Sequence, residues 1–304
     1  MSTVGGLVGS GTMRRRTGDA LSAYAMLAPA FVILTIFVIT ALVGAIYLSF
    51  FKWGFYLSPV WVGLQNFYLV VIDKMFWSSI LVGVEYTLAV IPVQLILAFV
   101  IASAIKKTRH LAGLFKTVIY IPTVVSGVIA SMIFIFIYSF KGGLLNELLG
   151  LFGIKAQAWT ANPRLAILAI AVPGIWLGLG VTTLIMLAGL NDIPSDYYEA
   201  AALDGASAIK QTVFITIPCL KNVFVYLFVT GIVGCMNMFD LAYFITGGGP
   251  LNRTDMPVVH VFNHFANDPT IAYALSAGLL LFAMLGVLSI VIFRVISSEK
   301  AIDT

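Results

Sequence analysis

The sequence predicts an all-α integral membrane protein with six transmembrane helices. Apolar residues make up 61% of its 304 residues and charged residues only 10%, whereas soluble globular domains contain about 45–50% and about 25% of these classes. Six apolar runs are long enough to cross a bilayer as helices, which takes about 20 residues each. A net charge of +4 from so few charged residues provides no basic surface for nucleic acid. The composition therefore excludes a water-soluble fold, a disordered chain and a nucleic-acid-binding protein.

The first apolar run follows the three arginines Arg14–Arg16, an arrangement also found at the start of secretory signal peptides. The apolar core of a signal peptide has roughly 7–15 residues, and this run is much longer. We therefore interpret it as a retained signal anchor. The six predicted spans lie near 22–51, 77–105, 114–140, 165–190, 222–245 and 270–296.

The lysines and arginines between the runs predict the orientation, because cytosolic loops carry an excess of basic residues. Most of the 17 lysines and arginines fall on the cytosolic side if the N-terminus lies in the cytosol. An even number of spans then returns the C-terminus to the same side. We expect a cytosolic segment over residues 1–21, one transmembrane domain over 22–297 and a cytosolic tail over 298–304.

The cytosolic segment 191–221, between the fourth and fifth runs, has more local order than a simple connection requires. Pro194 suits the first turn of a helix, which Asp192 or Ser195 can cap. Asp196 and Glu199 favour the positive end of that helix. Gly205 can end it in the left-handed conformation.

A second short helix is predicted from Ala206 to Ile217, with Pro218 opening the fifth span. The two helices would form a helix–turn–helix on the cytosolic face. Its small residues allow a partner to approach closely, with Glu199 and Asp204 as charged points. The alternative interpretation is an interfacial helix lying on lipid, although the segment has little basic charge to hold it on an anionic membrane.

The same segment resembles the EAA motif of ABC importer permeases. Asp204-Gly205-Ala206-Ser207 looks like the longer form of this motif in the carbohydrate-uptake group of type I importers. The motif usually has Leu before its proline, where this chain has Ile217. The matching residues are Glu199-Ala200-Ala201, three residues, Gly205, nine residues, Ile215, one residue and Ile217-Pro218.

Other segments resemble the same family along most of the chain. The Val-Gly-Leu-x-Asn and Gly-Gly-Pro segments look like those of the first of the two permeases in maltose- and glycerol-phosphate-type systems. Tyr86 departs from the pattern, which commonly has Asn before Thr87-Leu88. The segments are Leu27-Ala28-Pro29-Ala30, Val62-Gly63-Leu64-Gln65-Asn66-Phe67, Phe76-Trp77, Ile121-Pro122, Leu187-Ala188-Gly189-Leu190, Phe239-Asp240 and Thr246-Gly247-Gly248-Gly249-Pro250.

The resemblance implies the type I ABC importer permease fold, in which the EAA segment forms a cytosolic coupling helix docked in a groove of an ATPase subunit. ATP-driven closure of two ATPase subunits would move paired coupling helices and switch the permeases by alternating access. In this comparison Glu199 anchors the helix electrostatically and Gly205 makes its turn. The implied coupling residues are Glu199, Ala200, Ala201, Asp204, Gly205, Ile215 and Pro218.

The resemblance also implies the partners: a second homologous permease, two ATPase subunits, an extracytoplasmic solute-binding protein and a carbohydrate substrate, all at a lipid bilayer. The chain has no Gly-Lys dipeptide, so it lacks the phosphate-binding loop G-x-x-x-x-G-K-[ST]. We therefore expect no enzyme activity and no cofactor in this chain, with ATP and Mg on the partner ATPase. The expected location is the plasma (inner) membrane of a bacterium or archaeon.

Polar residues within the spans are candidates for a substrate path, because burying them in a membrane is costly. Glu85 can instead snorkel or pair with a base of an outer loop, and Asp240 can instead anchor a helix near the interface. Helical periodicity alone does not show whether these polar side chains face a common path. The candidates are Glu85, Gln94, Thr182, Thr183, Asn237 and Asp240.

The third outer segment contains two further motifs. Gly247-Gly248-Gly249-Pro250 does not match a nucleotide-binding loop, and we predict a turn that folds the loop against a docked binding protein. His260 and His264 stand at i and i+4, a spacing that can bridge a metal in a helix. No Glu follows the first histidine and no third ligand is apparent nearby, so we predict no metal site.

Two other interpretations of function stay open. A stand-alone secondary transporter would require mid-membrane carboxylates and broken spans in two matching halves, and neither is visible in the sequence. Glycerol-3-phosphate or another polyol derivative is the alternative to an oligosaccharide as substrate.

Overall fold

The computed structural model describes residues 24–54, 57–108, 111–268 and 270–297, and almost all of its regular structure is helical. Within these residues, five helices are long and apolar enough to cross a membrane, and one bent pair of helices can supply a sixth span. This agrees with the predicted spans in number and, for five of them, in position.

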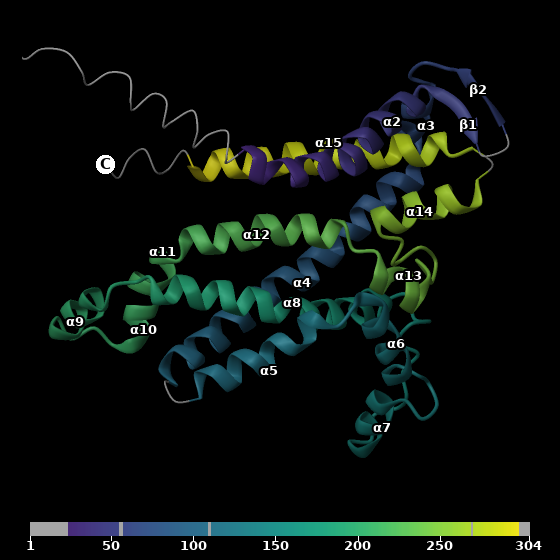
Figure 1. Cartoon of the computed structure of the whole chain (residues 1–304). Coiled ribbons are helices and arrows are strands. Elements are labelled where there is room, and N and C mark those ends of the chain that lie inside the picture. The colour runs from purple at the N-terminus through teal and green to yellow at the C-terminus, as the bar shows by residue number, and fades with distance from the viewer. Residues whose placement is uncertain (1–23, 55–56, 109–110, 269, 298–304) are drawn as a thin grey trace, which may run out of the picture.

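The two ends of the molecule carry different elements (Figure 1). At one end lie α9 (Ser195–Leu203) and α10 (Ala208–Gln211), and we call this the EAA end. At the other lie a β-hairpin and α14 (Pro257–Asn267), and we call this the hairpin end. Both ends are reached by α4 (Lys74–Lys107), which is the longest helix in the described part of the chain.

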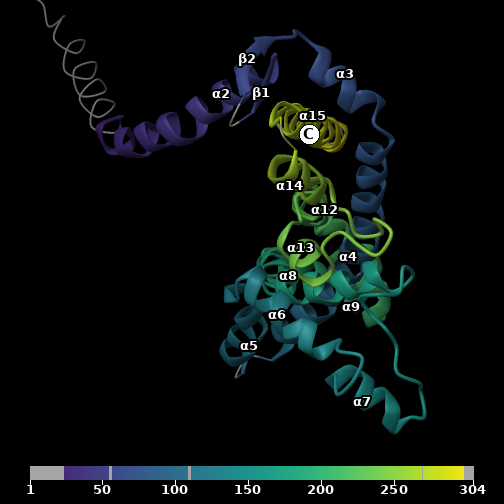
Figure 2. The same cartoon turned by 90° about the vertical axis from the view of Figure 1, so that its right-hand side faces the viewer.

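The first span is the helix Tyr24–Ser49, which includes a π-helical turn, η1 (Thr35–Ile39), and α2 (Thr40–Ser49). Its most apolar 18-residue window has no buried residue. Figure 2 shows why: the span runs away from the stack of the other helices and meets α15 (Ala272–Ser297) only near the hairpin end. This span therefore takes almost no part in the core of its own chain.

A short β-hairpin follows the first span and was not predicted from the sequence. Strand β1 (Phe51–Gly54) pairs antiparallel with β2 (Leu57–Trp61), with Phe51 opposite Trp61. The buried side chain of Asn66, at the start of α3 (Gln65–Ile72), donates to the carbonyl oxygens of Ser49 and Phe51 at 2.7 and 3.0 Å. These two bonds close the end of the first span against α3.

The tightest helix packing involves α8 (Ala166–Asn191), which lies between α4 and α5 (Ala112–Val124). A Cβ added at Gly180 of α8 would lie 2.7 Å from the carbonyl oxygen of Ile119 and 2.6 Å from the hydroxyl of Thr123. Only glycine leaves room for this approach, as is usual between membrane helices. The Thr123 hydroxyl donates to the Leu177 carbonyl at 3.0 Å across the same contact.

The third apolar run is not one straight span, which corrects the prediction for 114–140. It forms α5 and α6 (Gly127–Ile137), which meet at an angle of 92°. Val125 is extended, and the Ser126 hydroxyl accepts from the Ile129 amide at 3.3 Å, so a new helix begins there. The N-cap at Ser126 explains the break, because a capping residue takes a non-helical backbone conformation.

The fifth run is also interrupted near its end. Helix α12 (Lys221–Met236) stops at Asn237, and α13 (Asp240–Thr246) continues the segment. Beyond α13 come α14 and the last span, α15. The remaining short helix, α7 (Leu144–Leu151), lies in the segment between α6 and α8.

Candidate functional site

Helix α9 at the EAA end terminates as the sequence predicts. Gly205 is left-handed, with φ +74°. Its amide donates to the Ala202 carbonyl at 3.0 Å, and the Ala206 amide donates to the Ala201 carbonyl at 2.9 Å. This pair of bonds is the Schellman motif, which satisfies the last carbonyl groups of a helix. The prediction that Gly205 ends the first helix of the EAA segment is confirmed.

The start of α9 differs from the prediction. Pro194 takes the N-cap position rather than the first turn, and no side chain caps the helix. Asp192 instead ends α8, where its amide donates to the Ala188 carbonyl at 3.1 Å. The Ser195 hydroxyl faces the Asp196 carboxylate at 3.4 Å. The prediction that Asp192 or Ser195 caps this helix is therefore wrong, because Pro194 already supplies the extended residue that starts it.

The second part of the EAA segment is helical from Ala208 to Cys219, in three pieces: α10, a π-helical stretch η2 (Thr212–Thr216), and α11 (Ile217–Cys219). Pro218 lies inside α11, and the fifth span begins at Lys221, which corrects the prediction that Pro218 opens it. The π-helical widening precedes the proline, where the ring would otherwise clash with the preceding turn.

The EAA segment is fixed to the bundle by apolar contacts. Ile193 is buried, and Tyr198 and Ile215 pack against the same cluster. That cluster includes Ala102 of α4 and Leu190 of α8. The role of Ile215 is therefore to hold the segment on the bundle, while residues on the opposite face stay free.

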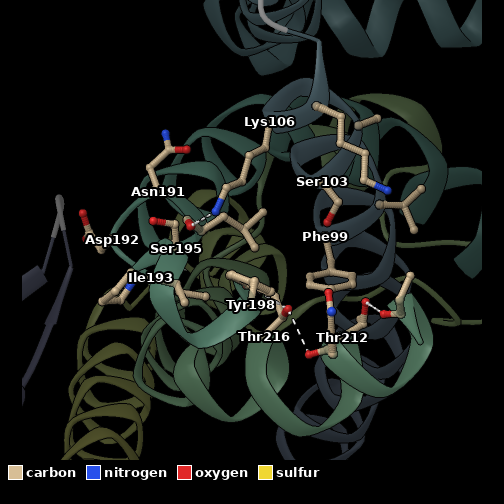
Figure 3. Close-up of a pocket in the computed structure, with 17 residues that line it drawn as sticks. Phe99, Ser103, Lys106, Asn191, Asp192, Ile193, Ser195, Tyr198, Thr212 and Thr216 are labelled. Carbon is tan, nitrogen blue, oxygen red and sulfur yellow. Dashed lines mark hydrogen bonds between the residues drawn. The ribbon is translucent and has the colours of Figure 1, made fainter. Parts of the chain in front are cut away.

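Polar contacts reinforce this attachment (Figure 3). The Lys106 ammonium donates to the Leu190 carbonyl at 2.5 Å and lies 5.6 Å from the ring centre of Tyr198. The Tyr198 and Thr216 hydroxyls are 3.0 Å apart, so α9 is also bonded to η2. Lys106 and Tyr198 were not predicted as functional residues, because their pairing depends on how α4 and α9 meet in space.

A cavity of about 1020 Å³ lies beneath the segment, between α4, the end of α8, α9 and α10. Its walls combine the ring of Phe99 with the polar side chains of Ser103, Asp192 and Gln211. Figure 3 shows the labelled side chains around this space. The EAA segment is thus attached to the bundle through Lys106 and Tyr198, while this cavity separates another part of it from α4.

The outward face of the segment is exposed and partly apolar. Glu199, Ala200, Asp204 and Pro218 are exposed, and Ala201 is half-buried. Leu203, in the last turn of α9, is 90% exposed, and Ile209 and Phe214 are 77% and 74% exposed. Exposed leucine beside exposed carboxylates at the end of a helix is a surface that a partner protein can cover.

Within the bundle, the structure brings together two of the six candidate path residues. The Gln94 amide of α4 donates to the Thr182 hydroxyl of α8 at 2.6 Å, and that hydroxyl donates to the Gly178 carbonyl at 2.9 Å. Thr183 is fully buried on α8, and its hydroxyl has no hydrogen-bond partner among the described residues.

The other three candidates lie apart from this pair. Glu85 is paired with Arg253 of the hairpin-end loop at 3.2 Å, which is the outer-loop pairing that the sequence left open. Asn237 is exposed and donates to the Val233 carbonyl of its own helix at 2.8 Å. Asp240 packs against Gly127 at the start of α6, and its carbonyl faces the Ser131 hydroxyl at 3.3 Å.

The glycine-rich segment at the hairpin end forms a folded turn. Gly247 and Gly248 are left-handed, and Gly249-Pro250 has a cis peptide bond. The buried Thr254 hydroxyl donates to the Gly249 carbonyl at 2.6 Å. The exposed tip is Leu251, at 85%, while Gly248 is buried. The glycines therefore shape this turn, and residues after Pro250 form its outer surface.

These features define a multi-pass membrane protein with a helix–turn–helix at one end and a folded loop at the other. The chain belongs to the family described as binding-protein-dependent transport system inner membrane component, whose model matches residues 94–300. It is a permease of an ABC importer, and its fold is that of the type I group.

Two kinds of relatives are similar to the chain over most of its length. The trehalose/maltose transport system permease protein MalF of Thermococcus litoralis is 29% identical over 255 residues, covering 84% of this chain and 86% of that protein. A bacterial ABC transporter involved in the import of the acidic polysaccharide alginate contains a chain with a TM-score of 0.80 and 18% identity, covering 93% of this chain and 98% of that one. A structure of a bacterial alginate ABC transporter in complex with an alginate pentasaccharide-bound periplasmic protein gives a TM-score of 0.78, 19% identity and coverage of 91% and 94%.

Proposed function

We propose that this chain is one permease subunit of an ATP-driven importer that moves a carbohydrate across the plasma membrane by alternating access. It pairs with a second, homologous permease and with two ATPase subunits, which hold ATP and Mg. An extracytoplasmic solute-binding protein delivers the substrate at the hairpin end. The names of the similar proteins, for trehalose, maltose and alginate, support a carbohydrate.

The observation that carries this proposal is the way α9 is held. Its outward face, with Glu199 and Leu203, is exposed, while Lys106 and Tyr198 tie its inner face to α4 and α8. A subunit that pulls or pushes α9 therefore moves the ends of both spans. The docking of an exposed helix in a groove of a partner is a common recognition mode.

The polar pair inside the bundle lies on the same two spans. Gln94 and Thr182 join α4 to α8, and Gln94 precedes Lys106 on α4 by twelve residues, or about 18 Å along a helix axis. A displacement of α9 that shifts α4 relative to α8 would therefore change the hydrogen bond between Gln94 and Thr182. We place the substrate path beside this pair and leave Glu85, which is paired with Arg253, outside it.

The proposal includes an orientation in the membrane. Docking of an ATPase requires the EAA end to face the cytosol, and we propose that both termini lie on that side. The exposed first span, Tyr24–Ser49, contacts lipid or the second permease, because none of its apolar window is covered within this chain.

An uncharged carbohydrate fits the spans better than a phosphorylated polyol. The lysines and arginines of the spanning helices lie within the first or last five residues, such as Lys74, Lys116 and Arg294. A phosphate would favour a positive group inside the membrane path. Glycerol-3-phosphate is the alternative substrate. A direct binding measurement with the cognate solute-binding protein separates the two, because the proposal requires this protein to bind a carbohydrate and not glycerol-3-phosphate.

Purification of the membrane complex tests the proposal. We expect an ATPase to co-elute with this chain, and its hydrolysis rate to rise when the loaded solute-binding protein is added. Leu203→Ser should reduce co-elution, because it removes exposed apolar contact at α9. Leu151→Ser is the matched control, since Leu151 is 80% exposed on α7, outside the EAA segment. Uptake by this chain alone in liposomes would establish a secondary transporter and overturn the proposal.

A further inference from the structure

Two histidines on α14 lie next to an aspartate from a distant part of the sequence. His260 and His264 are one helical turn apart, and their rings have centres 4.7 Å from each other. Asp73, the residue that caps α4, completes the group. One ligand atom from each of the three side chains lies within 4.8 Å of the others. The sequence showed no third ligand because Asp73 belongs to the first outer segment.

Each histidine is oriented by a carboxylate of its own segment. The Nδ1 atom of His260 is 3.0 Å from the Asp255 carboxylate, and the Nδ1 atom of His264 is 2.6 Å from the Asp268 carboxylate. A bond of this kind leaves Nε2 as the nitrogen that can bind a metal, and it is common behind metal-binding histidines. The Nε2 atom of His260 is 3.4 Å from the Tyr273 hydroxyl and 3.8 Å from Asp73 Oδ2.

The surroundings carry excess negative charge. Three carboxylates, from Asp73, Asp255 and Asp268, surround two histidines. Asp255 is buried, and its Oδ1 atom has no hydrogen-bond partner among the described residues. Arg253, the basic residue of the same loop, is paired with Glu85 instead.

The Asp73 carboxylate is held in position by its neighbours. It accepts hydrogen bonds from the Tyr273 hydroxyl and from the Met75 amide, the latter at 2.8 Å. A cavity of about 260 Å³ adjoins the group and is lined by Asp255, His264 and Asp268.

We propose that Asp73, His260 and His264 form a binding site for a divalent transition metal of the zinc class. Two imidazole nitrogens and one carboxylate favour zinc, cobalt or nickel over calcium or magnesium, which prefer oxygen ligands. Zinc binds such ligands at about 2.0–2.2 Å, so the ligand atoms must approach to roughly 3.3 Å from one another. The ligand atoms lie within 4.8 Å of one another, so binding requires the three side chains to rotate toward a common point. Water is available as a fourth ligand, whereas the Tyr273 hydroxyl donates to Asp73.

The site would join three separate segments at the hairpin end. Asp73 links α3 to α4, the histidines belong to α14, and Tyr273 lies at the start of α15. Figure 1 shows these elements converging beside the hairpin. A bound metal would therefore cross-link α14 to the start of α4. This inference does not depend on the proposed transport function.

Cobalt substitution tests the site directly. The full chain, purified in detergent with any affinity tag removed, is titrated with Co²⁺ and then with competing Zn²⁺. We expect one Co²⁺ per chain, with the intense visible absorption of four-coordinate cobalt, and its complete displacement by Zn²⁺. His264→Ala should abolish this absorption, and Asp73→Asn should do the same with little change in shape. Asp268→Asn should weaken binding about 10- to 100-fold, as expected for a carboxylate behind a metal ligand.

His110→Ala is the control, because His110 is the remaining histidine of the sequence and is not one of the proposed ligands. It should bind Co²⁺ like the wild type. The proposal is overturned if the wild type shows no four-coordinate cobalt absorption and retains no zinc after dialysis. It is also overturned if the variants at Asp73 and His264 bind cobalt as tightly as the wild type. Transport is not measured in any of these experiments, so the outcome does not affect the proposed function.

Discussion

The ammonium group of Lys106 lies 5.6 Å from the ring centre of Tyr198 and also bonds the Leu190 carbonyl at 2.5 Å. One side chain of α4 thus holds both the end of α8 and the inner face of α9. Lys106 therefore links the three helices at the EAA end.

Lys106→Met should weaken this linkage without removing the apolar stem of the side chain. Loss of the cation–π contact and the hydrogen bond amounts to about 1–2 kcal/mol, so transport per ATP hydrolysed should fall at least about fivefold. The measurement is carbohydrate uptake and ATP hydrolysis in the same proteoliposomes. Lys107→Met is the control, because no hydrogen bond or ion pair of Lys107 is present in the described part of the chain. Equal effects of the two changes would contradict this role of Lys106.

Gly205→Ala should impair coupling while membrane insertion stays normal. The left-handed backbone at φ +74° costs roughly 1–2 kcal/mol once a Cβ is present, although no atom lies within 4 Å of that Cβ. Gly205→Asn should behave close to the wild type, because Asn tolerates this conformation. Gly234→Ala is the control, with equal free space and an ordinary φ. ATPase activity that responds normally to the loaded binding protein in Gly205→Ala would contradict the prediction.

Gly180→Ala should reduce the stability of the bundle. The new Cβ would meet the Ile119 carbonyl at 2.7 Å and force α5 away from α8, an overpacking that typically costs about 1–3 kcal/mol. The midpoint of thermal unfolding in detergent should fall by several degrees. Gly113→Ala, in open space on α5, should leave it unchanged. An unchanged midpoint for both variants would show that α5 shifts freely.

The ion pair between Glu85 and Arg253 should contribute little to stability. Both side chains are nearly half exposed, at 47% and 46%, and exposed pairs contribute about 0–1 kcal/mol. Glu85→Gln should leave thermal unfolding unchanged, but stimulation of the ATPase by the binding protein should fall if the pair positions the tip at Leu251. The exchange Glu85→Arg with Arg253→Glu should restore stimulation. Normal stimulation in the single variant would exclude a positioning role.

The EAA segment could be predicted because its signals are local. Gly205 and the Glu199-Ala200-Ala201 sequence act within two helical turns, so spacing alone places them on a helix and its end. The start of α9 was less predictable, since Asp192, Pro194 and Ser195 are all adequate at a helix N-terminus. Only the end of α8 decides among them, because Asp192 is the C-cap of that helix.

The break between α5 and α6 could not be predicted from hydropathy, because the run is apolar on both sides of it. Ser126 caps a new helix there, and Asp240, from a segment far along the chain, packs against Gly127 at its start. The same limit applies to the polar candidates. Gln94 and Thr182 meet, whereas Glu85 turns to Arg253, and each choice depends on the packing of α4 rather than on sequence spacing.

The exposed first span has a consequence for how its sequence can vary. No residue of its apolar window is buried within this chain, so substitutions there should have little effect on the folding stability of the chain itself. They should instead affect the contacts that the span makes after assembly. We therefore expect the sequence of Tyr24–Ser49 to vary with that of the partner permease. Exchange of this segment between two related permeases should then change which partner permease each one binds.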